Sequence, residues 1–163
     1  MKAARYYLAA ALLVVLDQVT KVLTRAYLVG QGTVVLIPGV VGLTYVENTG
    51  MAFSSFSGYT PVLAVLSFVV SVLLAVAIWK KWLPHPFCQW MLTLILAGAV
   101  GNLIDRAFLG YVTDMIQVLF IHFAVFNVAD CCVVVGGILL AVYVIFFWKD
   151  GAQKPSASGE DKA

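Results

Sequence analysis

Charged residues are scarce in this chain. Of its 163 residues, 63% are hydrophobic and only 11% are Asp, Glu, Lys or Arg. A composition this apolar predicts that most of the chain lies in lipid, and the length predicts a single domain. The net charge is +2 and no long basic run occurs, which excludes the electrostatic surface that nucleic-acid binding requires.

Histidine and cysteine are also rare. The two histidines, His85 and His122, fall in different predicted loops, and Cys131 and Cys132 are adjacent within a predicted span. These residues do not complete a metal-ligand set, so we expect no metal and no cofactor, and we expect the two thiols to be buried and inert. No second histidine accompanies the serines at positions 54, 55 and 57, which disfavours a serine triad. Carboxylates remain as the groups available for chemistry.

Four segments are long and apolar enough to cross a hydrocarbon core, which takes about 20 helical residues. They are the ranges 5–27, 61–79, 87–107 and 127–148. The first follows Lys2 and Arg5 as in a signal peptide, but its apolar run is too long for one, so we expect it to be retained. The sequence therefore predicts an α-helical membrane protein with four transmembrane helices.

Two segments between the spans, 30–58 and 109–125, have a different character. Short β-branched runs broken by glycine and proline favour strands. The candidate strands are 34–37, 41–46, 111–113 and 121–125, with a turn at Pro38-Gly39 between the first two. Open strand edges are not viable within lipid, so we expect a small sheet that rests on the membrane surface.

Basic residues predict the orientation of the spans. Lysine and arginine precede the first span, follow the second and follow the fourth, at positions 2, 5, 80, 81, 149 and 154. An even number of spans places all of them on one side, which we expect to be the cytoplasm. Both termini are then cytoplasmic, both irregular segments are extracytoplasmic, and the polar tail, about 150–163, is expected to be disordered.

Four aspartates occur where a chain this apolar should tolerate few. A carboxylate at membrane depth costs several kcal/mol unless it is neutral, paired or facing a polar cavity. Asp17, Lys21 and Arg25 are spaced by four residues and share a helix face, so Asp17 and Lys21 can pair within the first span. Either this face supports a site near the outer surface or it contacts a substrate directly.

Three polar segments carry the remaining candidates. Asn48 and Gly50 form an ordinary turn signal that can also be a loop cradling a substrate. At the outer end of the third span, Asn102, Asp105 and Arg106 adjoin a glycine-rich packing face, so we expect them to point inward rather than to lipid. The remaining candidates are Asp114 in the outer segment and Asn127 with Asp130 at the start of the fourth span, where this last pair also fits a capping box.

Two carboxylates brought together can act as an acid–base pair. Like charges a few Å apart cannot both ionise, so one group keeps a proton while the other activates a water. The residues alone do not decide whether Asp105 or Asp114 is the partner of Asp130. A small proton-coupled transporter is the alternative, although it should spread acids through the bilayer and show a repeat. A non-catalytic assembly factor would not need two aspartates each accompanied by asparagine.

The motifs taken together resemble the bacterial lipoprotein signal peptidases (signal peptidase II), over nearly the whole chain from Tyr6 to Trp148. The matching motifs are Asp17-Gln18-x-x-Lys21, Asn48-x-Gly50-x-Ala52-Phe53, Gly98-x-x-Gly101-Asn102-Leu103-Ile104-Asp105-Arg106, Val112-x-Asp114 and Phe126-Asn127-x-Ala129-Asp130. The chain departs from the usual pattern at Met51, at Met115 and at Cys131-Cys132, and none of these departures removes a motif residue.

The resemblance implies an aspartic endopeptidase of the bacterial inner membrane with its active site at the extracytoplasmic face. It implies cleavage of prolipoproteins just before a diacylglyceryl-modified cysteine, inhibition by the cyclic peptide globomycin, and no metal. By this resemblance the catalytic pair is Asp114 and Asp130. It further implies that Asn48, Gly50, Asn102, Arg106 and Asn127 line the site, that Asp105 is a partner of Arg106, and that Asp17 and Lys21 are supporting residues. We expect a monomer whose partners are membrane lipids and prolipoprotein signal peptides.

Overall fold

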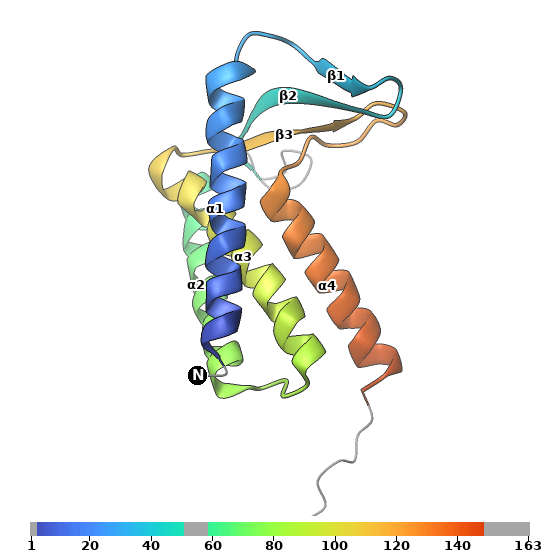
Figure 1. The fold of residues 1–163 in the computed structure, drawn as a ribbon. Coiled ribbons are helices and arrows are strands. Elements are labelled where there is room, and N and C mark those ends of the chain that lie inside the picture. The colour runs from blue at the N-terminus through green and yellow to red at the C-terminus, as the bar shows by residue number, and fades with distance from the viewer. Residues whose placement is uncertain (1–2, 51–58, 149–163) are drawn as a thin grey trace, which may run out of the picture.

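The computed structural model describes residues 3–50 and 59–148, and within them it contains the four expected helices (Figure 1). They are α1 (Ala4–Tyr27), α2 (Thr60–Lys80), α3 (Pro86–Phe108) and α4 (Val128–Phe146). All four are long and apolar enough to cross a membrane. At 1.5 Å per residue, the 21 residues of α2 extend roughly 31 Å, which matches the thickness of a hydrocarbon core.

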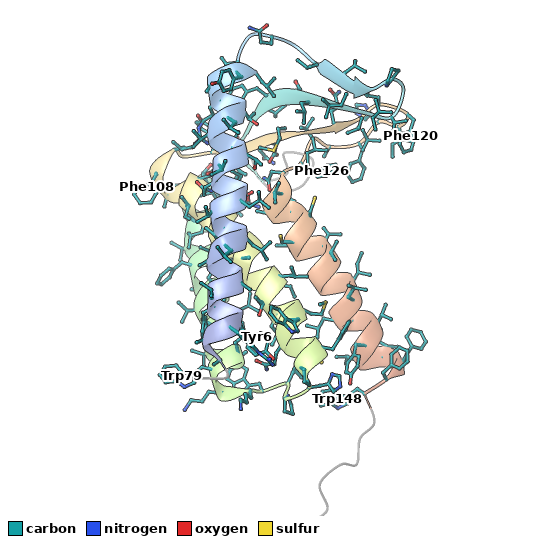
Figure 2. The ribbon with its side chains drawn as sticks, in the orientation of Figure 1. Tyr6, Trp79, Phe108, Phe120, Phe126 and Trp148 are labelled. Carbon is teal, nitrogen blue, oxygen red and sulfur yellow. The ribbon has the colours of Figure 1, made fainter. Side chains whose placement is uncertain are left out.

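Helix α3 is the centre of the bundle and packs against the other three helices. Half of its most apolar window is buried, against about a fifth or less in the others, whose outer faces carry large exposed apolar side chains (Figure 2). The core at the end of the bundle away from the sheet is formed by Tyr6, Ala10, Ala77, Ile78, Leu92, Leu96 and Ala97. Large apolar side chains on the outside of a bundle are expected of helices that are surrounded by lipid.

Small residues let α3 approach α1 and α4 closely. A Cβ added at Gly98 would come within 2.6 Å of Val133 Cγ2 and collide with the Ala129 carbonyl oxygen. A Cβ at Gly101 would come within 2.6 Å of Asp17 Oδ2. The glycines of the sequence motif are therefore required by the contacts between helices.

Strands β1 (Val34–Ile37), β2 (Val41–Asn48) and β3 (Val112–Val118) form an antiparallel sheet in the order β1-β2-β3. Gly39 takes a positive φ of 69° in the turn between β1 and β2, as the Pro38-Gly39 signal predicts. The sheet lies across one end of the bundle, and the N-terminus and the end of α4 lie at the other (Figure 1). The pairing of β2 with β3 sets Val46 opposite Asp114 and Asn48 opposite Val112.

The prediction of a strand at 121–125 is wrong, and the strand at 111–113 is longer than expected. β3 extends to Val118, and residues 121–125 form no ladder. They form the return from the edge of the sheet to α4, and the chain rejoins the sheet through a single bridge between Phe126 and Ile116. Their apolar side chains, among them Ile121 and Phe123, are exposed beside the bundle. The apolar composition of this segment therefore does not reflect strand pairing.

Candidate active site

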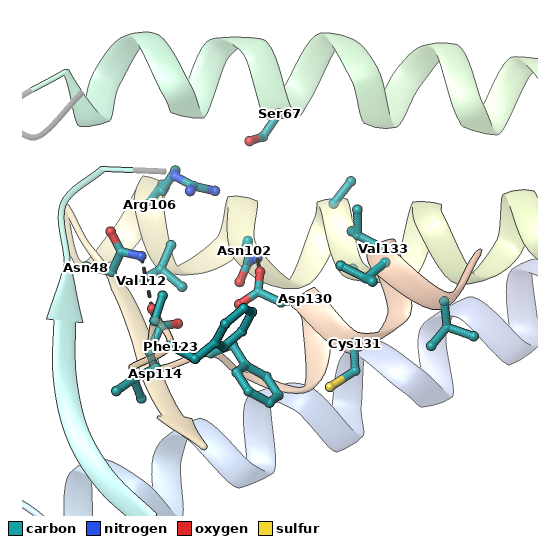
Figure 3. A pocket seen from close by; sticks show the side chains of 17 residues that line it. Asn48, Ser67, Asn102, Arg106, Val112, Asp114, Phe123, Asp130, Cys131 and Val133 are labelled. Atoms are coloured by element: carbon teal, nitrogen blue, oxygen red, sulfur yellow. Dashed lines mark hydrogen bonds between the residues drawn. The ribbon is translucent and has the colours of Figure 1, made fainter. Parts of the chain in front are cut away.

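A cavity of about 610 Å³ is lined by residues of α2, α3 and α4 and by residues of β2 and β3 (Figure 3). One end is polar and is lined by Asn48, Asn102, Arg106, Asp114 and Asp130. The other end is apolar and includes Gly98, Ala99 and the valines at 133, 134 and 135. Asp17, Lys21 and Asp105 do not line it. A cavity with both characters suits a ligand that is polar at one end and hydrophobic along the rest.

The two aspartates of the cavity come from different elements. Asp114 belongs to β3 and is 2% exposed, whereas Asp130 is in the first turn of α4 and is half-buried. Asn127 joins them. Its side-chain nitrogen donates to Asp114 Oδ1 at 2.6 Å, and it forms the predicted capping box with Asp130, in which each residue's side chain accepts from the other's backbone N–H.

All four carboxylate oxygens of this pair accept hydrogen bonds from uncharged amides. Asn48 donates to Asp114 Oδ2 at 2.9 Å, and Asn102 donates to Asp130 Oδ1 at 2.8 Å (Figure 3). The other two donors are the side chain and backbone of Asn127. No lysine or arginine forms an ion pair with either aspartate among the described residues. Neutral donors fix both groups without holding them in the ionised state as a bound cation would.

The environment of Asp114 raises its pKa to about 6. Burial is the main cause, because it penalises the charged form, and the charge of Asp130 acts in the same direction. The hydrogen bonds from Asn48 and Asn127 and the charge of Lys21 oppose this rise in pKa. A carboxyl group with a pKa near 6 is suited to exchange a proton close to neutral pH.

Arg106 and the turn after β2 close the polar end. Arg106 Nη2 donates to the carbonyl oxygen of Gly50 at 3.1 Å, and the Gly50 N–H donates to Asn48 Oδ1 at 2.9 Å. Arg106 Nε is buried and has no hydrogen-bond partner among the described residues. The rest of this loop, including the departure at Met51, lies outside the described residues, as does the tail. The arginine thus holds the turn after β2 at the polar end of the cavity.

Asp17 and Lys21 pair within α1, as the spacing predicts, with Lys21 Nζ 2.9 Å from Asp17 Oδ2. Both side chains are fully buried beneath the site. Asp17 Oδ1 accepts from the backbone N–H of Ala129, so it holds the start of α4. Lys21 donates to Asn102 Oδ1 at 2.8 Å, which turns the nitrogen of that amide toward Asp130. Of the two roles that the sequence leaves open, these contacts favour support.

Asp105 is not a partner of Arg106, contrary to the expectation. Its carboxylate lies 3.5 Å from Lys21 Nζ, and it accepts from the backbone N–H of Thr113 at 2.9 Å. Arg106 makes no ion pair with Asp105 within the part of the chain that the structure describes. The family resemblance suggested the pair, but successive residues on a helix point in different directions. Asp105 therefore anchors β3 to α3.

Several contributing residues were not expected. The Gln18 amide donates to the Gly101 carbonyl and to Asp105, and Arg25 donates to the Thr113 hydroxyl at 2.8 Å. The shared helix face of Asp17, Lys21 and Arg25 indicates the last contact, and Gln18 belongs to the motif Asp17-Gln18-x-x-Lys21, although the sequence assigns neither Gln18 nor Arg25 a role. Cys132 is buried as expected, but Cys131 is half-buried and lines the cavity.

Comparison with known proteins gives a consistent family. The family described as signal peptidase (SPase) II matches residues 9–146. A lipoprotein signal peptidase of Enterococcus faecalis is 42% identical over 140 residues, which cover 86% of this chain and 87% of the relative. That of Caldanaerobacter subterraneus is 44% identical over 137 residues, covering 83% and 92%. A solved bacterial membrane enzyme superposes with a TM-score of 0.81 at 28% identity, over 93% of this chain and 95% of the other.

Proposed function

Because the chain belongs to the signal peptidase II family, we propose that it uses Asp114 and Asp130 to remove the signal peptides of prolipoproteins. The observation that carries this proposal is the joint environment of the pair. Two carboxylates from separate elements face one cavity, are linked through Asn127, and receive only amide hydrogen bonds among the described residues. The transporter alternative finds no support in the relatives, which are lipoprotein signal peptidases.

In the proposed reaction one aspartate is ionised and the other keeps a proton. The ionised group takes a proton from water, and the water oxygen attacks the scissile carbonyl carbon. The protonated group gives its proton to the carbonyl oxygen, which yields a neutral tetrahedral intermediate. When the C–N bond breaks, the leaving nitrogen takes the proton from the first aspartate, and the second aspartate takes a proton from a hydroxyl of the intermediate as the new carbonyl forms, so the pair returns to its starting state.

The cavity suits the two parts of such a substrate. The polar end is lined by the Arg106 guanidinium and the Asn48 and Asn102 amides, which fit the carbonyl oxygens of a bound peptide. The apolar end, lined by Ala99 and Val133, fits the hydrophobic segment of a signal peptide or the acyl chains of a diacylglyceryl-modified cysteine. These features support cleavage just before that modified cysteine. The proposed enzyme acts in the cytoplasmic membrane with its site facing outward.

A cleavage assay with purified enzyme in detergent tests this function. We expect a diacylglyceryl-modified prolipoprotein to be cut before its modified cysteine, as read from product masses, and the same precursor without the lipid to be cut far more slowly. Globomycin should inhibit the reaction, and a chelator should leave it unchanged. Equal cleavage of both precursors, or cleavage at another bond, would refute the proposed substrate.

The variant Asp130→Asn is the inactive control for this assay, because its amide cannot cycle a proton with Asp114. Glu47→Gln is the matched active control. Glu47 is an exposed carboxylate of β2, next to Asn48 but outside the cavity lining, so its neutralisation should leave cleavage unchanged.

A further inference from the structure

Helix α2 contributes one polar side chain to the cavity, that of Ser67. Figure 3 shows the Ser67 hydroxyl pointing from α2 toward α3, on the opposite wall from Asn102 and Asp130. In the same view it lies between Arg106 at the polar end and Val133 at the apolar end. Ser67 therefore marks the boundary between the two halves of the cavity.

The Ser67 hydroxyl differs from most serine and threonine hydroxyls of these helices. A serine or threonine in a membrane span commonly donates to a carbonyl of the preceding turn, because lipid offers no other acceptor. Ser71 does so to the Ser67 carbonyl at 2.7 Å, and Thr93 does so to the Gln89 carbonyl at 2.7 Å. Ser67 Oγ makes no hydrogen bond to any described residue. A hydroxyl without a hydrogen-bond partner is unfavourable beside an apolar wall. A bound ligand that accepts a hydrogen bond from Ser67 would remove this cost.

We propose that Ser67 is a substrate-binding residue that donates a hydrogen bond to a carbonyl oxygen at this boundary. The inference rests on the proposed function. A lipid-modified prolipoprotein would place two kinds of carbonyl at the boundary between the polar and apolar halves of the cavity. The last turn of a signal-peptide helix has backbone carbonyls without intrahelical partners, and each acyl chain of the modified cysteine begins at an ester carbonyl.

Three variants isolate the hydroxyl. Ser67→Ala removes the donor and breaks no hydrogen bond of the described protein, so its thermal stability should not change. Ser67→Thr keeps a hydroxyl at the same position and should keep wild-type kinetics. Ser71→Ala is the matched control, because it removes a hydroxyl one turn away whose hydrogen bond is internal to α2 and which does not line the cavity.

The variants are assayed on a prolipoprotein carrying either diester or diether glyceryl lipid, since the ether lacks the carbonyl. We expect Ser67→Ala to lower kcat/KM by about 3- to 10-fold, mainly through KM, as the loss of one hydrogen bond to substrate predicts. A loss confined to the diester assigns the bond to the ester, and an equal loss on both lipids assigns it to the peptide backbone.

Unchanged kcat/KM in Ser67→Ala on both lipids, or an equal loss in Ser71→Ala, would overturn the assignment of Ser67. That failure is separate from failure of the proposed function. If wild type cleaves the diester precursor and Asp130→Asn does not, the function stands whatever Ser67→Ala does. If wild type does not cleave it, both proposals fall.

Discussion

At the scale of single residues, the site separates two kinds of aspartate. Asp114 and Asp130 are held by neutral amides at the cavity, and Asp17 and Asp105 are held by the buried ammonium of Lys21 outside it. The first two carboxylates face the cavity without a cationic partner among the described residues, whereas the second two are paired with a buried cation. This contrast makes Asp114, rather than Asp105, the proposed partner of Asp130.

The pH dependence of cleavage tests the environment of Asp114. Burial raises its pKa to about 6, and the Asn48 amide lowers that pKa because it donates to the ionised form. Removing the donor in Asn48→Leu should raise the pKa further, so the shared proton is retained to higher pH. We therefore expect the basic limb of the kcat/KM profile to move to higher pH, with kcat reduced. Glu47→Gln should leave the limb in place, and a downward shift in Asn48→Leu would contradict the argument.

Stability measurements test the role of Lys21. Lys21→Met leaves both Asp17 and Asp105 without their cation, and breaking a buried pair in this way commonly costs about 3–5 kcal/mol. Asp17→Asn should cost less, because Lys21 keeps Asp105 and the asparagine oxygen can still accept from Ala129. Thermal unfolding in detergent gives this order directly.

The double variant Asp17→Asn/Lys21→Met adds a sharper comparison. If Lys21 served Asp17 alone, the double variant would be more stable than Asp17→Asn, because it removes the buried ammonium that the single variant leaves unpaired. Since Asp105 also depends on Lys21, we expect the double variant to remain clearly less stable than Asp17→Asn. A double variant as stable as Asp17→Asn, or more stable, would contradict a stabilising role for the contacts of Lys21 with Asp105 and Asn102.

At the scale of elements, the start of α4 is what brings Asp130 to the cavity. Gly98 permits this placement, because a Cβ there would collide with Ala129 and Val133. We expect Gly98→Ala to push α4 away from α3, to cost about 1–3 kcal/mol as overpacking does, and to lower cleavage strongly. Gly137→Ala is the matched control. Gly137 lies in α4, and a Cβ at this position meets nothing within 4 Å. Similar effects of the two substitutions on unfolding temperature and cleavage would contradict this account.

The sequence predicts the elements that depend on local signals. The lengths of the apolar runs predict the four helices, Pro38-Gly39 predicts the first hairpin, and the spacing of Asn127 and Asp130 predicts the capping box. The extent of β3 depends instead on its pairing with β2, which a short β-branched run does not reveal. Residues 121–125 have strand-like composition but no partner strand in the described sheet, so composition alone misassigned them.

The partners of the aspartates also lie beyond local sequence. Asp105 pairs with Lys21 on another helix, and Thr113 reaches Asp105 from β3. Neither contact leaves a periodic signal, which is why the residues alone could not choose between Asp105 and Asp114. That choice came from the family resemblance, and the placement of Asp105 outside the cavity lining agrees with it.

At the scale of the whole molecule, the two ends of the bundle differ. The sheet and the two cavity aspartates lie at one end, and the loop with Lys80 and Lys81 lies at the other (Figure 1). Exposed tryptophans at the end away from the sheet, including Trp79 and Trp148, fit an aromatic belt at a membrane surface (Figure 2). The proposed orientation places the sheet outside the cell and the lysines in the cytoplasm.

Cysteine labelling tests this orientation. In a background without the three native cysteines, Gln31→Cys places a thiol in the exposed turn before β1, and His85→Cys places one in the loop before α3. A membrane-impermeant maleimide applied to intact cells with an accessible outer surface should label position 31 and miss position 85 until the membrane is opened. The reverse pattern would put the site on the wrong side for exported precursors.

The most direct test of the central claim is the single-turnover cleavage rate of Asp114→Asn beside that of Asp105→Asn, each measured per folded molecule on the diacylglyceryl-modified precursor. Asp114→Asn should fold, bind the precursor and lose about 10²- to 10⁴-fold in rate, because its amide cannot exchange a proton with Asp130. Asp105→Asn should unfold more easily and retain most of its rate. Retained cleavage in Asp114→Asn together with lost cleavage in Asp105→Asn would show that the wrong carboxylate has been paired with Asp130.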